Sequence, residues 1–284
     1  IPLGESLPAS RAYTWRLIQN ALQSCKSVCR KSVHFLTLNV HHWGRIVQVE
    51  GLPAFTAKFV ELLALSSPDV ICLQDTKLSK YRQARVKQAF NMQGFHVTFT
   101  KGDSKFSCLT ATKVEFIVRR IEKGEGSIAN DVMLQNSRVR VVNTYWNPRP
   151  QSPEHQNARN WALNQVQNAT RCGNATILLG DINKPSCPKS FSIALATGLQ
   201  AWSPPDFTLI NVRGQSKPDI IMVSQHLCAA LEERKVHTNF PSLSDVHLPY
   251  SATVQLDAVR LSGIPLSVKR FMLPKADIFP IISD

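Results

Sequence analysis

The chain has 284 residues, of which 43% are hydrophobic and 19% are charged. This composition provides enough apolar surface for a sizeable core and excludes a wholly disordered chain. Since α/β domains of roughly 200–250 residues commonly fold as one unit, we expect one domain with short extensions. No apolar run reaches the length of about 18 residues that a transmembrane helix needs, so none is expected.

The charge is strongly positive. Thirty-three Lys and Arg residues face twenty Asp and Glu residues, which gives a formal charge of +13. Such a field attracts polyanions, so nucleic acid is the natural partner. A role of the charge in solubility stays open as an alternative. A membrane-surface role is less favoured, because no basic amphipathic stretch stands out.

Seven cysteines are present, an odd number. Cys72 and Cys108 lie inside apolar runs and are predicted to be small buried thiols, which favours an intracellular, reducing compartment. Cys25 and Cys29 have helical i, i+4 spacing, but no second ligand pair at zinc-site spacing accompanies them.

The N-terminal residues differ from the rest. The apolar spacing over 12–28 predicts a helix, and residues 1–32 are therefore interpreted as an N-terminal helical extension. The balance of basic residues over the single acidic Glu5 is similar to that of an organelle-targeted N-terminus, which makes a mitochondrial location one expectation.

The next elements follow in short alternation. An alternating strand is predicted from Val33 to Val40, and the following helix is ended by Ser66-Ser67-Pro68. After a fully apolar strand and a further helix, a meander of short strands is predicted. These elements are predicted as helices over 54–65 and 79–91 and strands over 33–40, 70–75, 95–100, 107–111, 114–119, 131–135 and 138–144.

The last part of the chain contains the apolar run from Ile177 to Leu179, which is followed by Gly180, Asp181, Ile182 and Asn183. Prolines argue against long regular elements after residue 256, so 33–256 is the predicted domain and 257–284 a tail. The predicted elements are helices over 153–170 and 190–197 and strands over 176–180, 218–224 and 251–256.

Polar residues stand at the ends of several predicted strands. A site for metal-assisted phosphoryl chemistry needs such residues, but each has a plain alternative as a turn residue, a helix cap or a surface histidine. The candidates are Asn39, Asp75, Tyr145, Asp181, Asn183, Asp219, Asp245 and His247.

The order of these residues and their flanking sequences carry a resemblance. The chain closely resembles the endonuclease/exonuclease/phosphatase superfamily of DNase I-like proteins in six segments, from about Val33 to Leu256. The segments are Leu38-Asn39-Val40, Asp69-Val70-Ile71-Cys72-Leu73-Gln74-Asp75, Val142-Asn143-Thr144-Tyr145, Leu179-Gly180-Asp181-Ile182-Asn183, Pro218-Asp219-Ile220-Ile221 and Leu243-Ser244-Asp245-Val246-His247-Leu248.

The resemblance implies a four-layered α/β sandwich, in which two mixed β-sheets pack face to face with helices outside and the site lies at one end. It implies Mg²⁺ as the cofactor, held by oxygen ligands near 2.0–2.1 Å. The metal would polarise a phosphoryl oxygen.

The resemblance also implies a role for each matching residue. Asn39 and Asp75, with Asp245, match the metal side of the site. Tyr145 matches a residue that contacts the scissile phosphate. Asp181, with its neighbour Asn183, matches the carboxylate that orients the attacking water. Asp219 matches the carboxylate that orients the catalytic histidine, His247. Near these, His41, Asn147 and Arg149 are candidates for substrate binding.

Two departures from the family pattern fall on the chemistry. Asp75 stands where the family has Glu and is one methylene shorter. Val246 separates Asp245 from His247, whereas the family motif has Asp and His adjacent. On a strand, neighbouring side chains point to opposite faces, so we expect these two residues not to keep both family directions unless a bulge intervenes.

Two hypotheses for function follow. One is an active Mg²⁺-dependent endonuclease or phosphodiesterase that cuts DNA or RNA. The other, favoured by the two departures, is a catalytically impaired protein that binds nucleic acid, RNA more than DNA, in a ribonucleoprotein such as an organelle ribosome. An inositol or lipid phosphatase is a minor alternative, since no extra basic motif for polyphosphorylated headgroups is present.

Overall fold

The computed structural model describes residues 32–41, 43, 51–100, 107–134, 137–147, 152–183, 187–239 and 246–256. The predicted helix over 12–28 and the tail 257–284 lie outside these residues, so the division into domain and extensions stays a prediction. The helices are α3 (Gly51–Ser66), α4 (Lys80–Met92), α5 (Pro153–Arg171), α6 (Pro188–Ala196) and α7 (Gln225–Cys228).

The strands are arranged in two six-stranded sheets and one hairpin. The first sheet has the order β13 (Leu231–Val236), β14 (Tyr250–Gln255), β1 (Ser32–Asn39), β2 (Val70–Gln74), β4 (Leu109–Lys113), β3 (Phe95–Phe99). The second has the order β5 (Ile117–Gly124), β6 (Ser127–Leu134), β7 (Ser137–Tyr145), β8 (Ala175–Asp181), β12 (Asp219–Ser224), β9 (Leu199–Trp202). The hairpin pairs β10 (Leu209–Asn211) with β11 (Gly214–Ser216).

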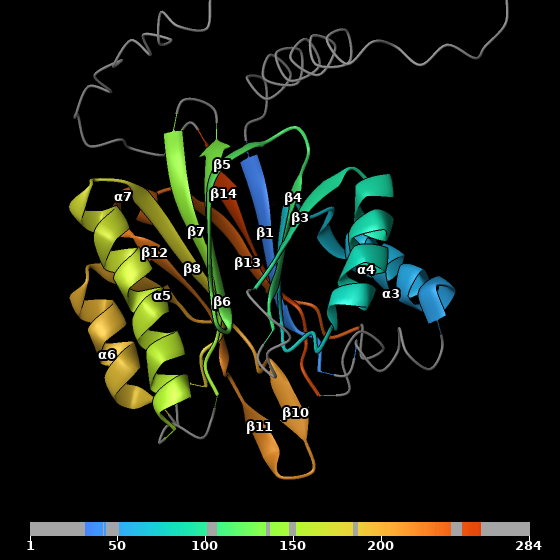
Figure 1. The fold of residues 1–284 in the computed structure, drawn as a ribbon. Helices are drawn as coiled ribbons and strands as arrows, with labels where there is room; N and C mark the ends of the chain where they lie inside the picture. The colour runs from blue at the N-terminus through green and yellow to red at the C-terminus, as the bar shows by residue number, and fades with distance from the viewer. Residues whose placement is uncertain are drawn as a thin grey trace, which may run out of the picture.

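Both sheets are mixed. The pairs β1–β2 and β7–β8 are parallel, and the other pairs are antiparallel. The sheets face each other, with α3 and α4 covering one outer face and α5 and α6 the other (Figure 1). The expected four-layered sandwich is therefore confirmed.

The space between the sheets is apolar. Alternate residues of β1, such as Val33 and Phe35, meet residues of β8 and β12 such as Ile177 and Ile221. The intervening side chains of β1, Leu36 and Leu38, face outward to α3 and α4. Because the central strands are buried on both faces, they are continuous apolar runs instead of alternating ones.

The helices bury aromatic and aliphatic stripes on the outer faces. Phe59 of α3 and Phe90 of α4 pack with ring centroids 3.7 Å apart over the first sheet. On the other face, Ala162 and Val166 of α5 pack against Leu178 of β8. Burial of each large apolar side chain contributes roughly 1.5–3 kcal/mol, so these contacts fix the helices to the sheets.

The predicted meander is wrong in its topology. The chain leaves the first sheet after the β3–β4 hairpin and enters the second with β5, β6 and β7. Four short strands were not predicted, namely β9, β10, β11 and β13. In β13, four consecutive residues from Glu232 to Lys235 are exposed, so an apolar pattern is missing there.

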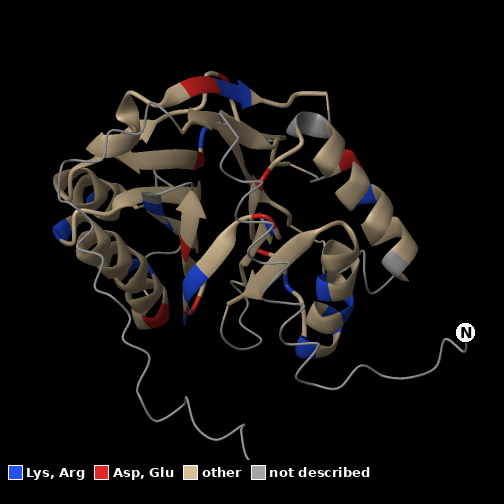
Figure 2. Cartoon of the chain, turned by 90° about the horizontal axis from the view of Figure 1, so that it is seen from above, with Lys and Arg blue, Asp and Glu red and all other residues tan. Residues whose placement is uncertain are grey.

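The structure confirms the two buried thiols predicted from the sequence and locates part of the positive charge. Cys72 and Cys108 are free and buried, as predicted. Lys and Arg residues cluster on α4, whereas α3 carries both signs (Figure 2). Among the described helices, none is long and apolar enough to cross a membrane.

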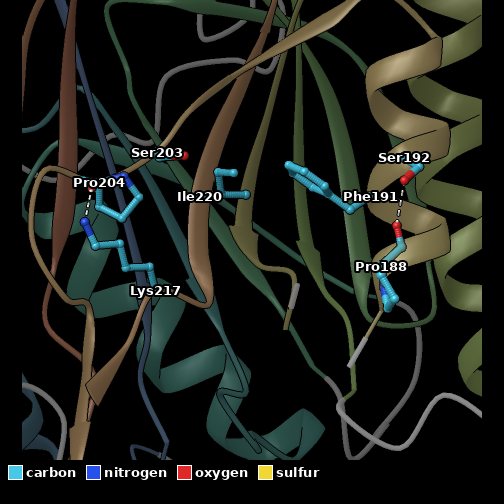
Figure 3. Close-up of a pocket in the computed structure, with 7 residues that line it drawn as sticks. All are labelled: Pro188, Phe191, Ser192, Ser203, Pro204, Lys217 and Ile220. Atoms are coloured by element: carbon cyan, nitrogen blue, oxygen red, sulfur yellow. Dashed lines mark hydrogen bonds between the residues drawn. The ribbon is translucent and has the colours of Figure 1, made fainter. Parts of the chain in front are cut away.

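A cavity of about 570 Å³ lies on the outer side of the second sheet, between α6 and the strand that begins at Asp219 (Figure 3). Phe191 and Ile220 form apolar walls. Lys217 lies at its rim, where the ammonium donates hydrogen bonds to the carbonyl oxygens of Pro204 and Pro205 at 3.1 and 3.2 Å. These bonds hold the segment before β12 against the end of β9.

Candidate active site

Four strand ends meet at one end of the sandwich. In the second sheet, Asp181 at the end of β8 is paired with Asp219 at the start of β12 and with Tyr145 at the end of β7. In the first sheet, β1 ends at Asn39, whose Nδ2 donates a 2.9 Å hydrogen bond to Oδ2 of Asp181. The two sheets are thus joined at the point where the candidate residues collect.

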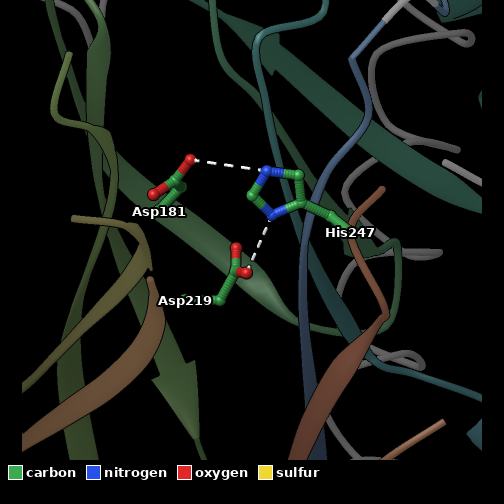
Figure 4. A group of neighbouring side chains, drawn as sticks. All are labelled: Asp181, Asp219 and His247. Atoms are coloured by element: carbon green, nitrogen blue, oxygen red, sulfur yellow. Dashed lines mark hydrogen bonds and ion pairs between the residues drawn. The ribbon is translucent and has the colours of Figure 1, made fainter. Parts of the chain in front are cut away.

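His247 completes this group (Figure 4). Its Nδ1 lies 2.9 Å from Oδ2 of Asp219, and its Nε2 lies 3.9 Å from Oδ2 of Asp181. All three side chains are buried, with His247 6% exposed. Burying two carboxylates is costly unless they are paired, and His247 lies within pairing distance of both.

His247 points toward Asp219, and the expectation that Asp245 and His247 do not both keep the family directions stays untested. Leu209 of β10 forms an isolated bridge with His247, and the amide of Ile210 donates to the carbonyl of Val246 at 2.9 Å. The amide of Leu248 donates to the carbonyl of Thr208 at 2.7 Å. Because the β10–β11 hairpin holds this segment before β14 begins, Val246 does not turn His247 away from Asp219. Asp245 lies outside the described residues.

Asp181 is held on both carboxylate oxygens. Oδ2 accepts the bond from Asn39, and Oδ1 accepts a 3.1 Å bond from the backbone amide of Asn183. Burial raises the pKa of Asp181, and the charge of Asp219 raises it further, to about 6 despite opposing effects of His247 and these hydrogen bonds. A buried carboxyl with such a pKa is suited to accept a proton near neutral pH.

The pKa of His247 is raised, whereas burial alone would lower the pKa of a histidine. Burial of the ring lowers the pKa, but the carboxylates of Asp219, Asp181 and Asp75 more than offset this, so that it rises to about 9. The ring is therefore protonated at neutral pH. Burial, and then the charges of Asp181 and Asp75, raise the pKa of Tyr145, so its hydroxyl stays protonated as well.

Asp75 has an unusual backbone conformation. Its φ is +53°, in the left-handed region where Asp is tolerated better than Glu, because its short side chain adapts locally. Its Oδ2 lies 3.2 Å from the ammonium of Lys77 and 3.9 Å from Nε2 of His41. Lys77 was not singled out from the sequence, although it stands only two residues after Asp75.

The donors available to a metal ion are mainly hard oxygens. Among the described residues, ligand atoms of Asp181, Asp219 and His247 all lie within 4.8 Å of one another, and Asp75 is not in this group. Oδ1 of Asp219 is buried and has no hydrogen-bond partner in the described part of the chain. Asn39 ends β1 and Asp75 directly follows β2, so both could add oxygen ligands. This donor chemistry fits Mg²⁺.

The other predicted residues take supporting positions. Asn183, with φ of +43°, donates from Nδ2 to the carbonyl of Trp146 at 2.7 Å. Its side chain thus fixes two loops together. The amide of His41 donates to Oδ1 of Asn39 at 3.1 Å. The carbonyl of Asn147 lies 3.7 Å from the thiol of Cys187. Arg149 lies outside the described residues.

A buried polar bridge between the sheets was missed. Nε2 of Gln74 in β2 donates to Oδ1 of Asn143 in β7 at 2.8 Å, and Nδ2 of Asn143 donates to the carbonyl of Leu109 at 2.8 Å. The sequence indication of this bridge was the presence of Gln74 and Asn143 in otherwise apolar strands, because buried polar groups must be paired. This bridge crosses the core next to the site.

The chain is similar to known proteins in structure. No family model and no curated protein sequence matches it. Three of the similar solved structures share 14–20% sequence identity with it: the 3′ phosphatase NExo from Neisseria bound to product DNA hairpin, an AP endonuclease from Archaeoglobus fulgidus, and the endonuclease domain of TRAS1, a telomere-specific non-LTR retrotransposon.

For NExo the TM-score is 0.59 at 20% identity, with 78% of this chain and 98% of that chain covered. For the Archaeoglobus enzyme the TM-score is 0.58 at 17% identity, with 78% of this chain and 98% of that chain covered. For the TRAS1 domain the TM-score is 0.59 at 14% identity, with 79% of this chain and 99% of that chain covered. The likeness establishes the fold, and the DNase I-like fold expected from the sequence is confirmed.

Proposed function

From the fold of the endonuclease/exonuclease/phosphatase superfamily and the buried group at its end, we propose that this protein hydrolyses phosphodiester bonds in nucleic acid. The observation that carries the proposal is the position of His247 between Asp219, at 2.9 Å, and Asp181, at 3.9 Å. Such a group has a cost in stability and perturbed pKa values, which are typical of catalytic sites. Structural neighbours named as nucleases, and the charge of +13, favour nucleic acid as the substrate.

In this proposal His247 acts on the phosphate. Asp219 accepts the hydrogen bond from Nδ1 and so fixes the ring with Nε2 turned toward Asp181. The protonated Nε2 donates to a phosphoryl oxygen placed between the two residues. A preorganised donor of this kind stabilises the charge that develops on the phosphate in the transition state.

Asp181 takes the proton of the attacking water, while the water oxygen bonds to phosphorus and the bond from phosphorus to the leaving sugar oxygen breaks. Asn39 and the amide of Asn183 fix its carboxylate, and the remaining acceptor sites of its two oxygens can take the water. Tyr145, whose hydroxyl stays protonated, is a further donor to the phosphate. Asn39 and Asp75, with Asp245, are the residues that would hold Mg²⁺, which when bound supplies polarisation of a phosphoryl oxygen.

The proposal is tested by cleavage assays on labelled duplex DNA, abasic DNA and structured RNA, with Mg²⁺ or Mn²⁺ and with chelator. We expect cleavage of at least one of these substrates that requires the divalent ion. Binding of all three without cleavage under any of these conditions would contradict the proposal.

The pH profile provides a second check on the roles of the two groups. We expect kcat/KM to rise as Asp181 loses its proton near pH 6 and to fall as His247 loses its proton near pH 9. Asp181 must be ionised to act as the base, so kcat/KM rises on the acid side of the profile. His247 must be protonated to act as the donor, so kcat/KM falls on the alkaline side. In His247→Gln the alkaline limb should disappear. A profile that is flat through both values would exclude these roles.

One observation favours a second candidate function. The carboxylate of Asp75 is shorter than Glu and lies 3.2 Å from the Lys77 ammonium, which already supplies positive charge there. A weakened metal site would leave a catalytically impaired protein that binds nucleic acid, such as an RNA-binding component of a ribonucleoprotein. This candidate predicts RNA binding without cleavage by the wild-type chain.

The variant Asp75→Glu separates the two candidates. We expect it to increase Mg²⁺-dependent cleavage on the order of tenfold, because the longer side chain restores the carboxylate length that the family pattern has among the residues that would hold Mg²⁺. Asp75→Asn is the matched control, because Asn is also tolerated at a positive φ but carries no charge. If Asp75→Glu cleaves no better than Asp75→Asn, the length of this carboxylate does not limit the rate.

A further inference from the structure

The exposed side of α4 is basic over the first two turns of the helix. The helix has the sequence KYRQARVKQAFNM and contains no Asp or Glu. Val86, Ala89 and Phe90 are buried against the first sheet. At 100° per residue, the exposed half of the helix carries Lys80 and Lys87 along one edge and Tyr81 and Arg85 along the other, and these four exposed residues are called the α4 face.

The helix dipole does not favour the positive charge at the start of α4. Lys80 and Arg82 stand in the first turn, where the helix dipole favours acidic residues and disfavours cations by about 0.3–1 kcal/mol each. Tyr81 is 74% exposed, although a large aromatic side chain gains by burial. A basic surface with an exposed aromatic ring is the combination that single-stranded nucleic acid binds.

The α4 face begins five residues after Asp75 of the candidate active site. Asp75, at the end of β2, is followed by Lys77 and then by the first residue of α4, Lys80. The Lys77 side chain is 42% exposed and lies against Asp75. The helix then runs away from the site along the first sheet (Figure 1), and its Lys and Arg residues form the basic cluster visible in Figure 2.

The positive field extends to the neighbouring strand edges. His96 of β3 has a lowered pKa because of partial burial and then because of the charges of Lys87 and Lys123. Within the described part of the chain, neither Arg85 nor Lys87 forms an ion pair. Their charges are therefore available to phosphate groups.

Resting on the proposed function, we propose that the α4 face binds a single-stranded flank of the nucleic-acid substrate, adjacent to the scissile phosphate. Lys80, Arg85 and Lys87 contact backbone phosphates, and Tyr81 stacks on an unpaired base. The favoured substrate therefore has a single-stranded segment next to the cleaved bond on this side. Binding of this kind tolerates any base sequence, because every base has a π-face.

The test measures binding of the full chain to labelled oligothymidylate and to a duplex by fluorescence anisotropy over a range of salt concentrations in chelator. Arg85→Gln and Lys87→Gln should each reduce the magnitude of the slope of log K against log salt by about 0.7, the value for one phosphate on a single strand. Arg171→Gln is the matched control, because this exposed residue ends α5 at the opposite end of the sandwich. Its slope should stay at the wild-type value.

Tyr81→Ala tests the stacking contact. We expect it to weaken binding to oligothymidylate on the order of tenfold, with little effect on the duplex. An equal loss for both nucleic acids would overturn stacking on an unpaired base. Unchanged slopes in Arg85→Gln and Lys87→Gln would overturn the α4 face as a binding surface.

Hydrolysis of bis(p-nitrophenyl) phosphate distinguishes this proposal from the proposed function. This small diester occupies only the reacting centre, so the three α4 variants should hydrolyse it at the wild-type rate. If the wild-type chain hydrolyses neither this diester nor nucleic acid, the proposed function fails, while the salt slopes still decide whether the α4 face binds a strand.

Discussion

Replacing Asp181 with Asn is expected to lower phosphodiester hydrolysis by roughly 10²–10⁴-fold, the contribution of a positioned general base. The substitution keeps the shape of the side chain but removes the charge that accepts the proton of water. It also removes one of the two carboxylates that face His247. The measurement is kcat/KM on the substrate that the wild-type chain cleaves.

The matched control for this variant is Asp206→Asn. Asp206 is exposed and its carboxylate accepts a local bond from the amide of Phe207, so its loss should leave the rate unchanged. Circular dichroism of both variants checks the fold. A rate for Asp181→Asn within a factor of two of wild type would rule out Asp181 as the base, whatever the state of the metal site.

Replacing Gly180 with Ala is expected to have the largest effect on stability. A Cβ at this position would lie 1.9 Å from the carbonyl oxygen of Thr144 in the neighbouring strand, and the φ of Gly180 is +146°. The parallel strands β7 and β8 would have to separate just before Tyr145 and Asp181. Strain and lost ladder bonds together should cost at least about 3 kcal/mol.

Thermal denaturation measures this effect. For a domain of this size, about 3 kcal/mol corresponds to a fall in Tm of roughly 6–12 °C. Gly198→Ala is the control, because φ there is +88° but a Cβ would meet nothing within 4 Å. It should lose only about 1–2 kcal/mol through backbone strain. If the two variants have the same Tm, the close approach of Thr144 to Gly180 is not what the glycine provides.

The sequence predicted those parts of the fold that depend on local pattern. The runs that form β2, β8 and β12 are mainly apolar, and burial on both faces requires this composition. Because these strands end with polar residues, Asp181 and Asp219 could be placed at strand ends before the structure was known. The sandwich was identified from the order of such segments, which is a property of the whole chain.

Long-range contacts were beyond such reasoning. The direction of His247 depends on bridges to Leu209 and Thr208, which lie nearly forty residues away in the sequence. Likewise, the exposed residues of β13 form a strand because β14 provides partners, and no periodicity marks it. The conformation of Asp75 at φ of +53° also has no signature in residue types alone.

The polar bridge from Gln74 to Asn143 has a consequence for how the site comes into being. A slip of one sheet over the other by one residue would leave the amide of Asn143 buried and unpaired, at a cost of about 1–3 kcal/mol, because its partners all lie in the first sheet. The bridge therefore selects one alignment of the two sheets, and only in that alignment do Asn39 and Asp181 meet. The reacting centre belongs to neither sheet alone, and it forms in folding only when the two sheets dock.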